Sequence, residues 1–190
     1  ALIRDAWRRQ LLTPAIEKRL RKEHKSLLGP EDHLARVEFL LAQDNKSRLG
    51  AVNRILPLID KERRASVKAR IAVVERSKRA GSLLSKLDKR DKAEPGVLLA
   101  RIQWLRRTDK DKQAWSLLRS APKSPETLIG PKQWWLERDA QVRRALNDDS
   151  PKTAYALAKD HAGELDGSLS LFRRAVEPRS ARGRHQGVGR

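Results

Sequence analysis

The sequence contains no cysteine, few aromatic residues and no long apolar run. Without cysteine the chain cannot form disulfides or thiolate metal sites, although this absence does not fix the cellular compartment. No window approaches the roughly 18 consecutive apolar residues that a membrane-spanning helix requires. Aromatic residues make up 4% of the chain, and five of them are Trp. Each Trp is therefore a candidate either for the core or for a binding surface.

Common catalytic and nucleotide-binding motifs are also missing. The chain has no Gly-x-Gly-x-x-Gly, no phosphate-binding loop ending in Gly-Lys-Ser/Thr and no Gly-x-Ser-x-Gly elbow. Its four histidines show neither His-x-x-x-His nor His-Glu-x-x-His spacing, so a zinc site has no support. We therefore predict no catalytic residue, no metal site and no cofactor.

Basic residues greatly outnumber acidic ones. Lys and Arg number 43 against 24 Asp and Glu, which gives a formal net charge of +19. Such a charge attracts polyanions but does not dictate a fold. The basic residues are spread along the chain and gather only near its C-terminal end, which favours a generally basic, solvated surface. A specific polyanion site is the alternative.

Apolar residues recur at helical spacing throughout the chain, and no stretch alternates with the period of two that is typical of strands. A capping residue before proline predicts helix starts at Pro14 and Pro151, and Pro95 and Pro131 suit a first helical position. The charged run 88–94 is expected to form a loop. We expect helices over residues 1–10, 14–27, 31–42, 49–57, 60–77, 80–87, 95–108, 111–118, 131–146 and 151–162.

Two segments of the chain match each other without a gap. LARVEFLLAQDN begins at Leu34, and LARIQWLRRTDK begins at Leu99. The dipeptide Ala-Arg recurs at Ala35, Ala69 and Ala100, at intervals of roughly 30 to 40 residues, and a second helix follows each copy. Because one amphipathic helix pair cannot bury both of its faces alone, such pairs are expected to stack.

These patterns predict an all-α fold in which stacked antiparallel helix hairpins form a right-handed, tetratricopeptide-like superhelix, a partial ring or solenoid. We assign residues 1–170 to this superhelical domain. Residues 171–190 are rich in Arg and Gly and have hardly any apolar period, so we expect a basic, disordered tail there. The first residues, ALIRDAWRRQ, show no secretory signal, and we expect a chain that is mature, processed or truncated at this end.

The hairpin 131–162 carries two apolar faces. Trp135, Val142 and Leu146 fall on one side of its first helix and are expected to point inward. The stripe of the second helix is formed by Ala154, Leu157, Ala158 and His161. Because His161 lies on this apolar stripe, we expect it to be a packed, hydrogen-bonded residue and not a ligand.

Trp134 and Trp135 form the most conspicuous aromatic pair. Aromatic faces stack on sugars and nucleobases, so these residues and Arg138 of the same expected helix are the candidate ligand-binding residues. Packing between adjacent repeats is the alternative, and it is the more common role of such a pair. Trp104 and Trp115 flank an expected hairpin turn and are predicted core residues.

Acidic residues mostly stand next to bases, as in Glu137-Arg138-Asp139 and Asp109-Lys110-Asp111. Such patterns are typical of solvated helix ends and surface ion pairs. General acid–base catalysis instead needs a carboxyl group whose pKa is tuned in a dry pocket. We therefore expect these acids to lie at the surface.

Four segments, in this order and spacing, resemble the helical part of soluble lytic transglycosylases, most closely those of α-proteobacteria. They are KARIA at 68–72, LARIQWLRR at 99–107, SAP at 120–122 and WWLERDAQVRRALNDDSPKTAYALAKDHA at 134–162. The resemblance covers residues 3–162. It implies a large all-helical, ring- or U-shaped domain and a periplasmic location.

Members of that family cleave peptidoglycan between N-acetylmuramic acid and N-acetylglucosamine and leave a 1,6-anhydro ring. A single Glu in a C-terminal lysozyme-like domain performs this chemistry. The present chain has no Glu-Ser motif and no lysozyme-like segment, so no catalytic residue carries over. The resemblance thus implies an incomplete, non-catalytic scaffold, inactive alone, whose partner is the peptidoglycan glycan strand.

Two other functions stay open. A helical-repeat protein can hold another protein in the groove of its superhelix. The charge of +19 and the Arg-rich tail could instead serve nucleic-acid binding. We rank the peptidoglycan scaffold first, a protein partner second and nucleic acid last.

Overall fold

The computed structural model describes residues 2–123 and 130–159. These residues form helices, turns and loops without any strand, which confirms the all-α class. The α-helices are α1 (Leu2–Arg9), α2 (Pro14–Glu23), α3 (Pro30–Leu41), α4 (Leu49–Ile55), α5 (Arg64–Val74), α6 (Ala80–Lys86), α7 (Lys89–Ala93), α8 (Pro95–Arg107), α9 (Asp111–Arg119), α10 (Pro131–Asn147) and α11 (Pro151–Lys159). Four short 3₁₀ segments are η1 (Lys25–Leu27), η2 (Lys46–Arg48), η3 (Leu56–Leu58) and η4 (Lys61–Arg63). Within the two described ranges no helix is long and apolar enough to cross a lipid bilayer.

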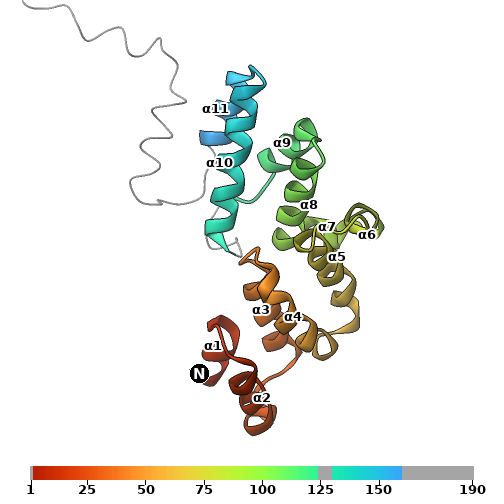
Figure 1. Cartoon of the computed structure of the whole chain (residues 1–190), viewed down its shortest axis with the longest axis vertical. Helices are drawn as coiled ribbons and strands as arrows, with labels where there is room; N and C mark the ends of the chain where they lie inside the picture. Colours follow the sequence, from red (N-terminus) through yellow and green to blue (C-terminus); the bar gives the residue numbers. More distant parts are fainter. Residues whose placement is uncertain (1, 124–129, 160–190) are drawn as a thin grey trace, which may run out of the picture.

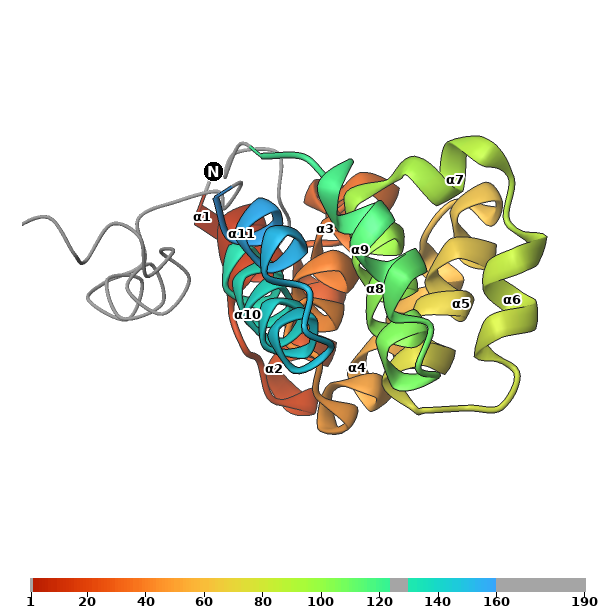
Figure 2. The ribbon, with the colours of Figure 1, turned by 90° about the horizontal axis from the view of Figure 1, so that it is seen from above.

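Helices that follow one another in the chain pack as pairs. Contacts join α3 to α4, α5 to α6, α8 to α9 and α10 to α11. The first helix of each pair also contacts the first helix of the next, from α3 through α5 and α8 to α10. Figure 1 shows the pairs following one another along a curved path, with α6 and α7 on its outer side. In the view from above, α10 and α11 lie on the side opposite α6 and α7 (Figure 2).

Each of these pairs turns at a residue with left-handed backbone geometry. The residues are Asp44 (φ 44°), Arg76 (φ 58°), Asp109 (φ 54°) and Asp149 (φ 49°). Aspartate tolerates this conformation better than most residues other than glycine. After α5, the amide of Ser77 donates to the carbonyl of Ala72 at 2.9 Å, the bond that closes a Schellman helix end, and the turns after α8 and α10 repeat it. The turn geometry therefore recurs with the helix pairs.

The start of α10 returns to the end of α3. Gly130, immediately before α10, has a φ of +70°, and a Cβ atom there would lie 2.7 Å from the Cβ of Ala42. Both the backbone angle and the close approach therefore require glycine at this position. This contact joins the two ends of the curve that runs from α3 to α10 (Figure 1).

Apolar side chains form adjoining clusters along the row of helices. The N-terminal cluster surrounds Trp7, the middle one includes Val97, and the C-terminal one includes Ile102, all of them fully buried. Trp104 packs against both the middle and the C-terminal clusters. Stability is thus shared between neighbouring pairs, as expected when one pair cannot cover its own apolar faces.

Most of the predicted helix starts are confirmed. Thr13 caps α2, because its hydroxyl oxygen accepts a hydrogen bond from the amide of Ile16 at 3.4 Å, and Pro14 begins the helix. Proline also begins α3, α8, α10 and α11. At a first helical position its missing N–H costs no intrahelical hydrogen bond.

Two of the predicted elements were wrong. The run 88–94 is not a loop but contains α7, because a side-chain oxygen of Asp88 accepts a hydrogen bond from the amide of Asp91 at 2.7 Å and caps that helix. The helix expected over 14–27 ends earlier, at Glu23, and η1 follows it.

Helix α10 is rotated relative to the face predicted from its apolar residues. Val142 is fully buried as predicted, but Trp135 is only half-buried and Leu146 is 38% exposed, whereas Trp134 is 2% exposed. The inward side includes the polar residues Glu137 and Gln141, which hydrophobic spacing cannot reveal. The stripe Ala154, Leu157 and Ala158 of α11 is buried as predicted. The expectations for His161 and for the tail 171–190 lie outside the described residues.

Candidate binding site around Trp104

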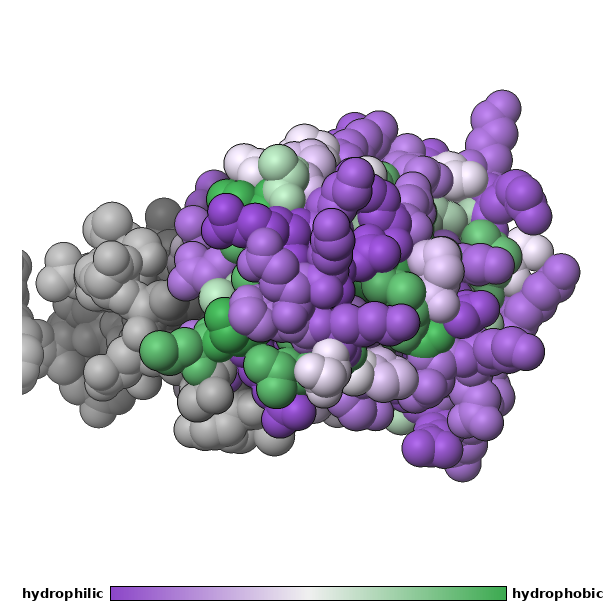
Figure 3. Space-filling view, turned by 90° about the horizontal axis from the view of Figure 1, so that it is seen from below, coloured by the Kyte–Doolittle hydropathy of each residue, from purple (hydrophilic) through white to green (hydrophobic). Residues whose placement is uncertain are grey.

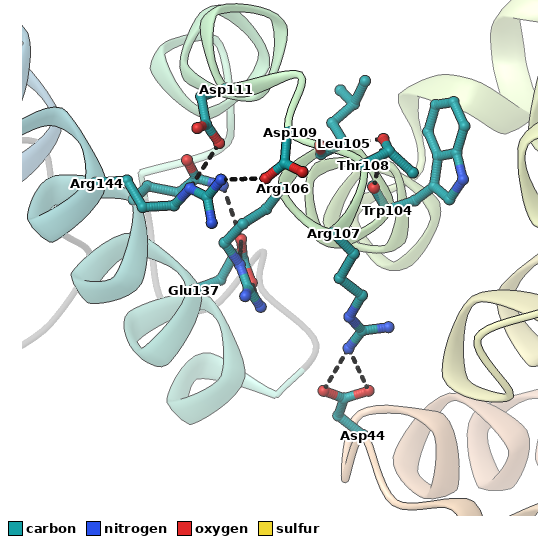
Figure 4. Close-up of polar contacts among 11 residues, drawn as sticks. Asp44, Trp104, Leu105, Arg106, Arg107, Thr108, Asp109, Asp111, Glu137 and Arg144 are labelled. Atoms are coloured by element: carbon teal, nitrogen blue, oxygen red, sulfur yellow. Dashed lines mark hydrogen bonds and ion pairs between the residues drawn. The ribbon is translucent and has the colours of Figure 1, made fainter. Parts of the chain in front are cut away.

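The last turn of α8 directs three neighbouring side chains to three different parts of the fold. Successive helical residues are rotated by about 100°, so Trp104, Arg106 and Arg107 cannot share one direction. Figure 4 shows Arg106 reaching toward Glu137 and Arg107 reaching toward Asp44, while the indole of Trp104 extends to the other side. This helix end therefore joins three helix pairs.

Arg106 connects α8 to α10. Its Nε and one terminal nitrogen donate to the two carboxylate oxygens of Glu137 at 2.8 and 2.9 Å. Gln141 adds a hydrogen bond to the same carboxylate at 2.9 Å. The hydrogen bonds to Glu137 raise the pKa of Arg106 above its ordinary value. Glu137 is thus a buried carboxylate held by a bidentate partner, and the expectation that it lies at the surface was wrong.

Arg107 and Arg144 make further links between the pairs. Arg107 donates to the carbonyl of Val73 at 2.8 Å and pairs with Asp44 at 3.2 Å, which ties α8 to α5 and to the turn after α3. Arg144 of α10 pairs with Asp109 at 2.7 Å and with Asp111 at 2.8 Å. Hydrogen bonds to these two carboxylates raise the pKa of Arg144. The turn between α8 and α9 is therefore anchored to α10 (Figure 4).

Trp104 is half-buried, so the prediction that it lies wholly in the core was only partly right. The ammonium of Lys110 lies 4.9 Å from the ring centroid, a cation–π arrangement. A Cβ atom at Gly81 would lie 2.4 Å from Cζ2 of the indole, so α6 can approach the ring only with glycine at this position. The indole is held by α6 and by the α8–α9 turn, and part of it faces outward.

Two hollows flank Trp104, and its side chain lines both. One has a volume of about 720 Å³ and lies between the end of α8 and the turn after α5. Its charged lining residues are Arg76, Lys78, Arg106, Arg107 and Asp44. The other has a volume of about 460 Å³ and lies between α6, α8 and α9. Its charged lining residues are Lys92 and Arg101.

Positive charge dominates both hollows. Among the described residues, Asp44 is their only acidic lining residue, and it already pairs with Arg107. Arg76 and Lys78 are exposed and form no ion pair within the described part of the chain. A partly exposed indole beside unpaired cations can hold a ligand that combines an apolar ring face with negative charge. We call Trp104 and these two hollows the Trp104 site.

The sequence-predicted ligand residues lie elsewhere, on α10. Trp134 is buried, and Arg138 is 5% exposed and donates to the carbonyl of Leu157 at 2.9 Å. Trp135 is half-buried. These positions favour the packing alternative for Trp134 and Arg138, and ligand stacking on Trp135 stays a prediction. Trp115 is 5% exposed, as expected of a core residue.

Sequence reasoning missed the cations of the Trp104 site. Arg76 and Lys78 follow the end of α5 and come near α8 only through the fold. The sequence does carry one signal: LARIQWLRRTDK has Trp104 and an Arg-Arg pair where the matching segment LARVEFLLAQDN has Phe39 and no Arg-Arg pair. Residues that differ between two copies of a repeat are not required by the packing that both copies share, so Trp104 and the Arg-Arg pair are candidates for another role.

The buried acidic residues of the described chain hold helices together. No group of three or more His, Cys, Asp or Glu side chains there could hold a metal ion. Each of these buried carboxylates pairs with arginine: Glu17 with Arg36 and Arg54, Asp32 with Arg8, and Glu137 with Arg106.

Comparisons with protein-family models, with curated proteins and with solved structures found no match.

Proposed function

We propose that the chain is a non-catalytic helical scaffold that binds the acidic glycan strands of peptidoglycan through the Trp104 site. The observation that carries this proposal is the half-buried indole standing between two hollows whose charged lining is almost wholly cationic. The resemblance to the helical part of periplasmic soluble lytic transglycosylases supports the choice of ligand and a periplasmic location. Two of the segments that carry this resemblance, LARIQWLRR and WWLER, are in contact, because Arg106 of the first forms an ion pair with Glu137 of the second.

A peptidoglycan strand has the chemistry that this site fits. Pyranose rings present C–H faces that pack on indole, as apolar groups pack on aromatic faces. The stem peptides carry carboxylates, which the unpaired Arg76 and Lys78 could bind at one side of Trp104. Lys92 and Arg101 offer the same chemistry on the other side. A strand lying across Trp104 would therefore meet cations in both directions.

The non-catalytic part of the proposal rests on the carboxyl groups. A general acid needs a raised pKa beside the reacting bond. Burial raises the pKa of Glu94, partly opposed by Arg63, with which it forms an ion pair. Glu94 lines neither hollow of the Trp104 site. Within the described part of the chain, the carboxyl group whose pKa is raised and the candidate ligand site therefore lie apart.

We also propose that the helix pairs form the right-handed, tetratricopeptide-like superhelix expected from the sequence. The recurrence of a left-handed residue after α3, α5, α8 and α10 supports a repeated unit. The contacts between the first helices of successive pairs support regular stacking. An experimental structure in which the pairs stack with left-handed or irregular rotation would contradict this arrangement.

Co-sedimentation with purified peptidoglycan sacculi tests the binding. The test variant is Arg76→Asn/Lys78→Gln, in which Asn suits the left-handed backbone at position 76. The matched control is Lys61→Gln/Lys68→Gln, which removes two exposed cations elsewhere. We expect the bound fraction to fall strongly in the test variant and little in the control. Equal losses in both variants would contradict a specific site, because they would reflect net charge alone.

Trp104→Leu provides an independent arm, since it removes the ring and leaves the charges. We expect weaker sedimentation, checked against the melting temperature because Trp104 also packs in the core. The products released from sacculi are analysed by mass spectrometry in the same experiment. Release of 1,6-anhydromuropeptides by the purified chain would overturn the non-catalytic claim.

Nucleic acid and protein partners are the competing functions. The net charge of +19 would attract DNA or RNA, and such binding without a site falls steeply as salt rises. Exposed apolar side chains at the N-terminal end, Leu2, Leu11, Ile16 and Leu27, could meet a protein. Retention of DNA at physiological salt, with no binding to sacculi, would replace the present proposal.

A further inference from the structure

A second basic cleft lies at the α2 end of the molecule, away from the Trp104 site. Its volume is about 440 Å³. The lining residues are Lys18, Arg21, Lys22, Lys25, Leu28, His33 and Leu58. They come from α2, η1, α3 and η3 and the residue after η1. Figure 3, seen from below, shows that hydrophilic side chains cover most of this end of the chain. We call this hollow the α2 cleft.

The four cations of the α2 cleft form one stripe. Lys18, Arg21 and Lys22 stand at positions i, i+3 and i+4 of α2 and share one face of it, and Lys25 of η1 lines the same cleft. Like charges at these spacings destabilise a helix. Within the described residues none of them forms an ion pair or a side-chain hydrogen bond. The fold therefore places four positive charges side by side, and none of them has an acidic partner among the described residues.

The acids of α2 are directed away from this stripe. Glu17 is buried on the inner side, where it meets Arg36 and Arg54. Glu23 pairs with Arg19. No carboxylate lines the cleft among the described residues. The acids of α2 therefore leave the four cations of the cleft without a carboxylate partner among the described residues.

His33 forms the inner wall of the cleft. It is 8% exposed, packs edge-on against Trp7 with ring centroids 5.4 Å apart, and its buried Nδ1 has no hydrogen-bond partner in the described structure. Burial lowers the pKa of His33, the nearby Arg21 lowers it further, and Asp32 opposes them. Asp32 itself is held by Arg8 at 2.6 Å. An imidazole nitrogen without a hydrogen-bond partner thus belongs to the same cleft as four unpaired cations.

We propose that the α2 cleft binds a compact phosphoryl-bearing anion that carries at least two negative charges. Three of the four cations are lysines, whose ammonium groups act as point charges suited to the tetrahedral phosphoryl group. A phosphoryl group concentrates a charge of about −1.5 to −2 and three acceptor oxygens in one compact group, whereas a carboxylate carries a single charge, so the four cations of the cleft favour the phosphoryl group. No indole or phenyl face lines the cleft, so the described site offers no platform for a base or a sugar ring. This inference stands independently of the peptidoglycan proposal.

The ligand could be free or could be the headgroup of an anionic lipid, and two arms of one experiment separate these sources. In the first, inorganic pyrophosphate is titrated into the full chain by calorimetry at physiological salt, with citrate as a carboxylate anion of comparable charge. In the second, flotation compares vesicles of phosphatidylglycerol and of phosphatidylcholine. Nuclear magnetic resonance locates the binding through the shifts of His33 and its neighbours.

Arg21→Gln/Lys22→Gln is the test variant, and Lys61→Gln/Lys68→Gln is the control with the same change in charge. We expect pyrophosphate to bind more tightly than citrate and the test variant to weaken it by about tenfold or more, with little effect in the control. Vesicle binding that the same variant abolishes would assign the anion to a lipid headgroup. Absence of binding in both arms, equal weakening in both variants, or tighter binding of citrate would overturn the proposal.

Discussion

The buried arginine of α3 allows the sharpest test of how this fold is held together. Arg36 is fully buried, and one of its terminal nitrogens donates to the carbonyls of Trp7 at 2.6 Å and of Gln10 at 3.1 Å. Its guanidinium lies 4.7 Å from the centroid of the Trp7 ring and 3.7 Å from the carboxylate of Glu17. Burial lowers the pKa of Arg36, and Glu17 opposes that shift. The residue thus fastens α1 and α2 to α3.

Arg36→Met should therefore destabilise the chain strongly. The substitution keeps much of the apolar stem but leaves two carbonyls without their donor and Glu17 with Arg54 alone. Breaking a buried ion pair by removing one partner costs about 3–5 kcal/mol, a large share of the roughly 5–15 kcal/mol that stabilises an ordinary domain. For a chain of this size we expect the melting temperature to fall by on the order of 10 °C.

Urea unfolding followed by circular dichroism measures this cost. Arg19→Met is the matched control, because Arg19 is an exposed partner of Glu23 and should contribute less than about 1 kcal/mol. The double variant Arg36→Met/Glu17→Met should recover part of the loss, since an apolar pair leaves no buried charge behind. A single-variant cost below about 1 kcal/mol, similar to that of the control, would refute the assigned role of Arg36.

Three further outcomes follow from close packing and from one shifted carboxyl. Gly81→Ala should destabilise the chain by about 1–3 kcal/mol, because the new methyl group would meet the ring of Trp104 at 2.4 Å. Gly50→Ala should stabilise it by about 0.5–1 kcal/mol, because α4 has room there and alanine favours helix; denaturant midpoints compare the two. Burial raises the pKa of Asp32, but hydrogen bonds from Gly29 and Arg8 outweigh it, and the net pKa is lowered from 3.8. The stability that Asp32 contributes should therefore be present above about pH 4 and disappear as pH falls through its lowered pKa. The free energy of unfolding of Asp32→Asn should accordingly be lower than that of the wild type at neutral pH, and the difference should become much smaller in acid.

The sequence predicted the helical class and most helix starts because the relevant signals are local. Proline at a first helical position and a hydroxyl cap act within one turn, as at Thr13 and Pro14. Helix α7 also has a local cap, Asp88, although the high charge of residues 88–94 is more typical of a loop. At this position the capping residue therefore determines the structure, and the charge does not.

The interior charges and the binding residues could not be predicted in the same way. Arg36 and Glu137 are buried because distant partners satisfy them, and those partners lie 19 and 31 residues away in the chain. Apolar spacing treats such residues as exposed and therefore placed Trp135, in place of Trp134, on the inner face of α10. The Trp104 site likewise depends on contacts between α5, α6 and α8.

The most direct test of the scaffold proposal compares two forms of one ligand. A peptidoglycan disaccharide peptide with free stem carboxylates, and the same compound with those carboxylates amidated, are titrated into the full chain by calorimetry. The proposed Trp104 site predicts binding of the free acid, clear weakening on amidation, and loss of that difference in Arg76→Asn/Lys78→Gln. Failure of the free acid to bind, or equal affinity for both forms, would contradict recognition of an acidic glycan.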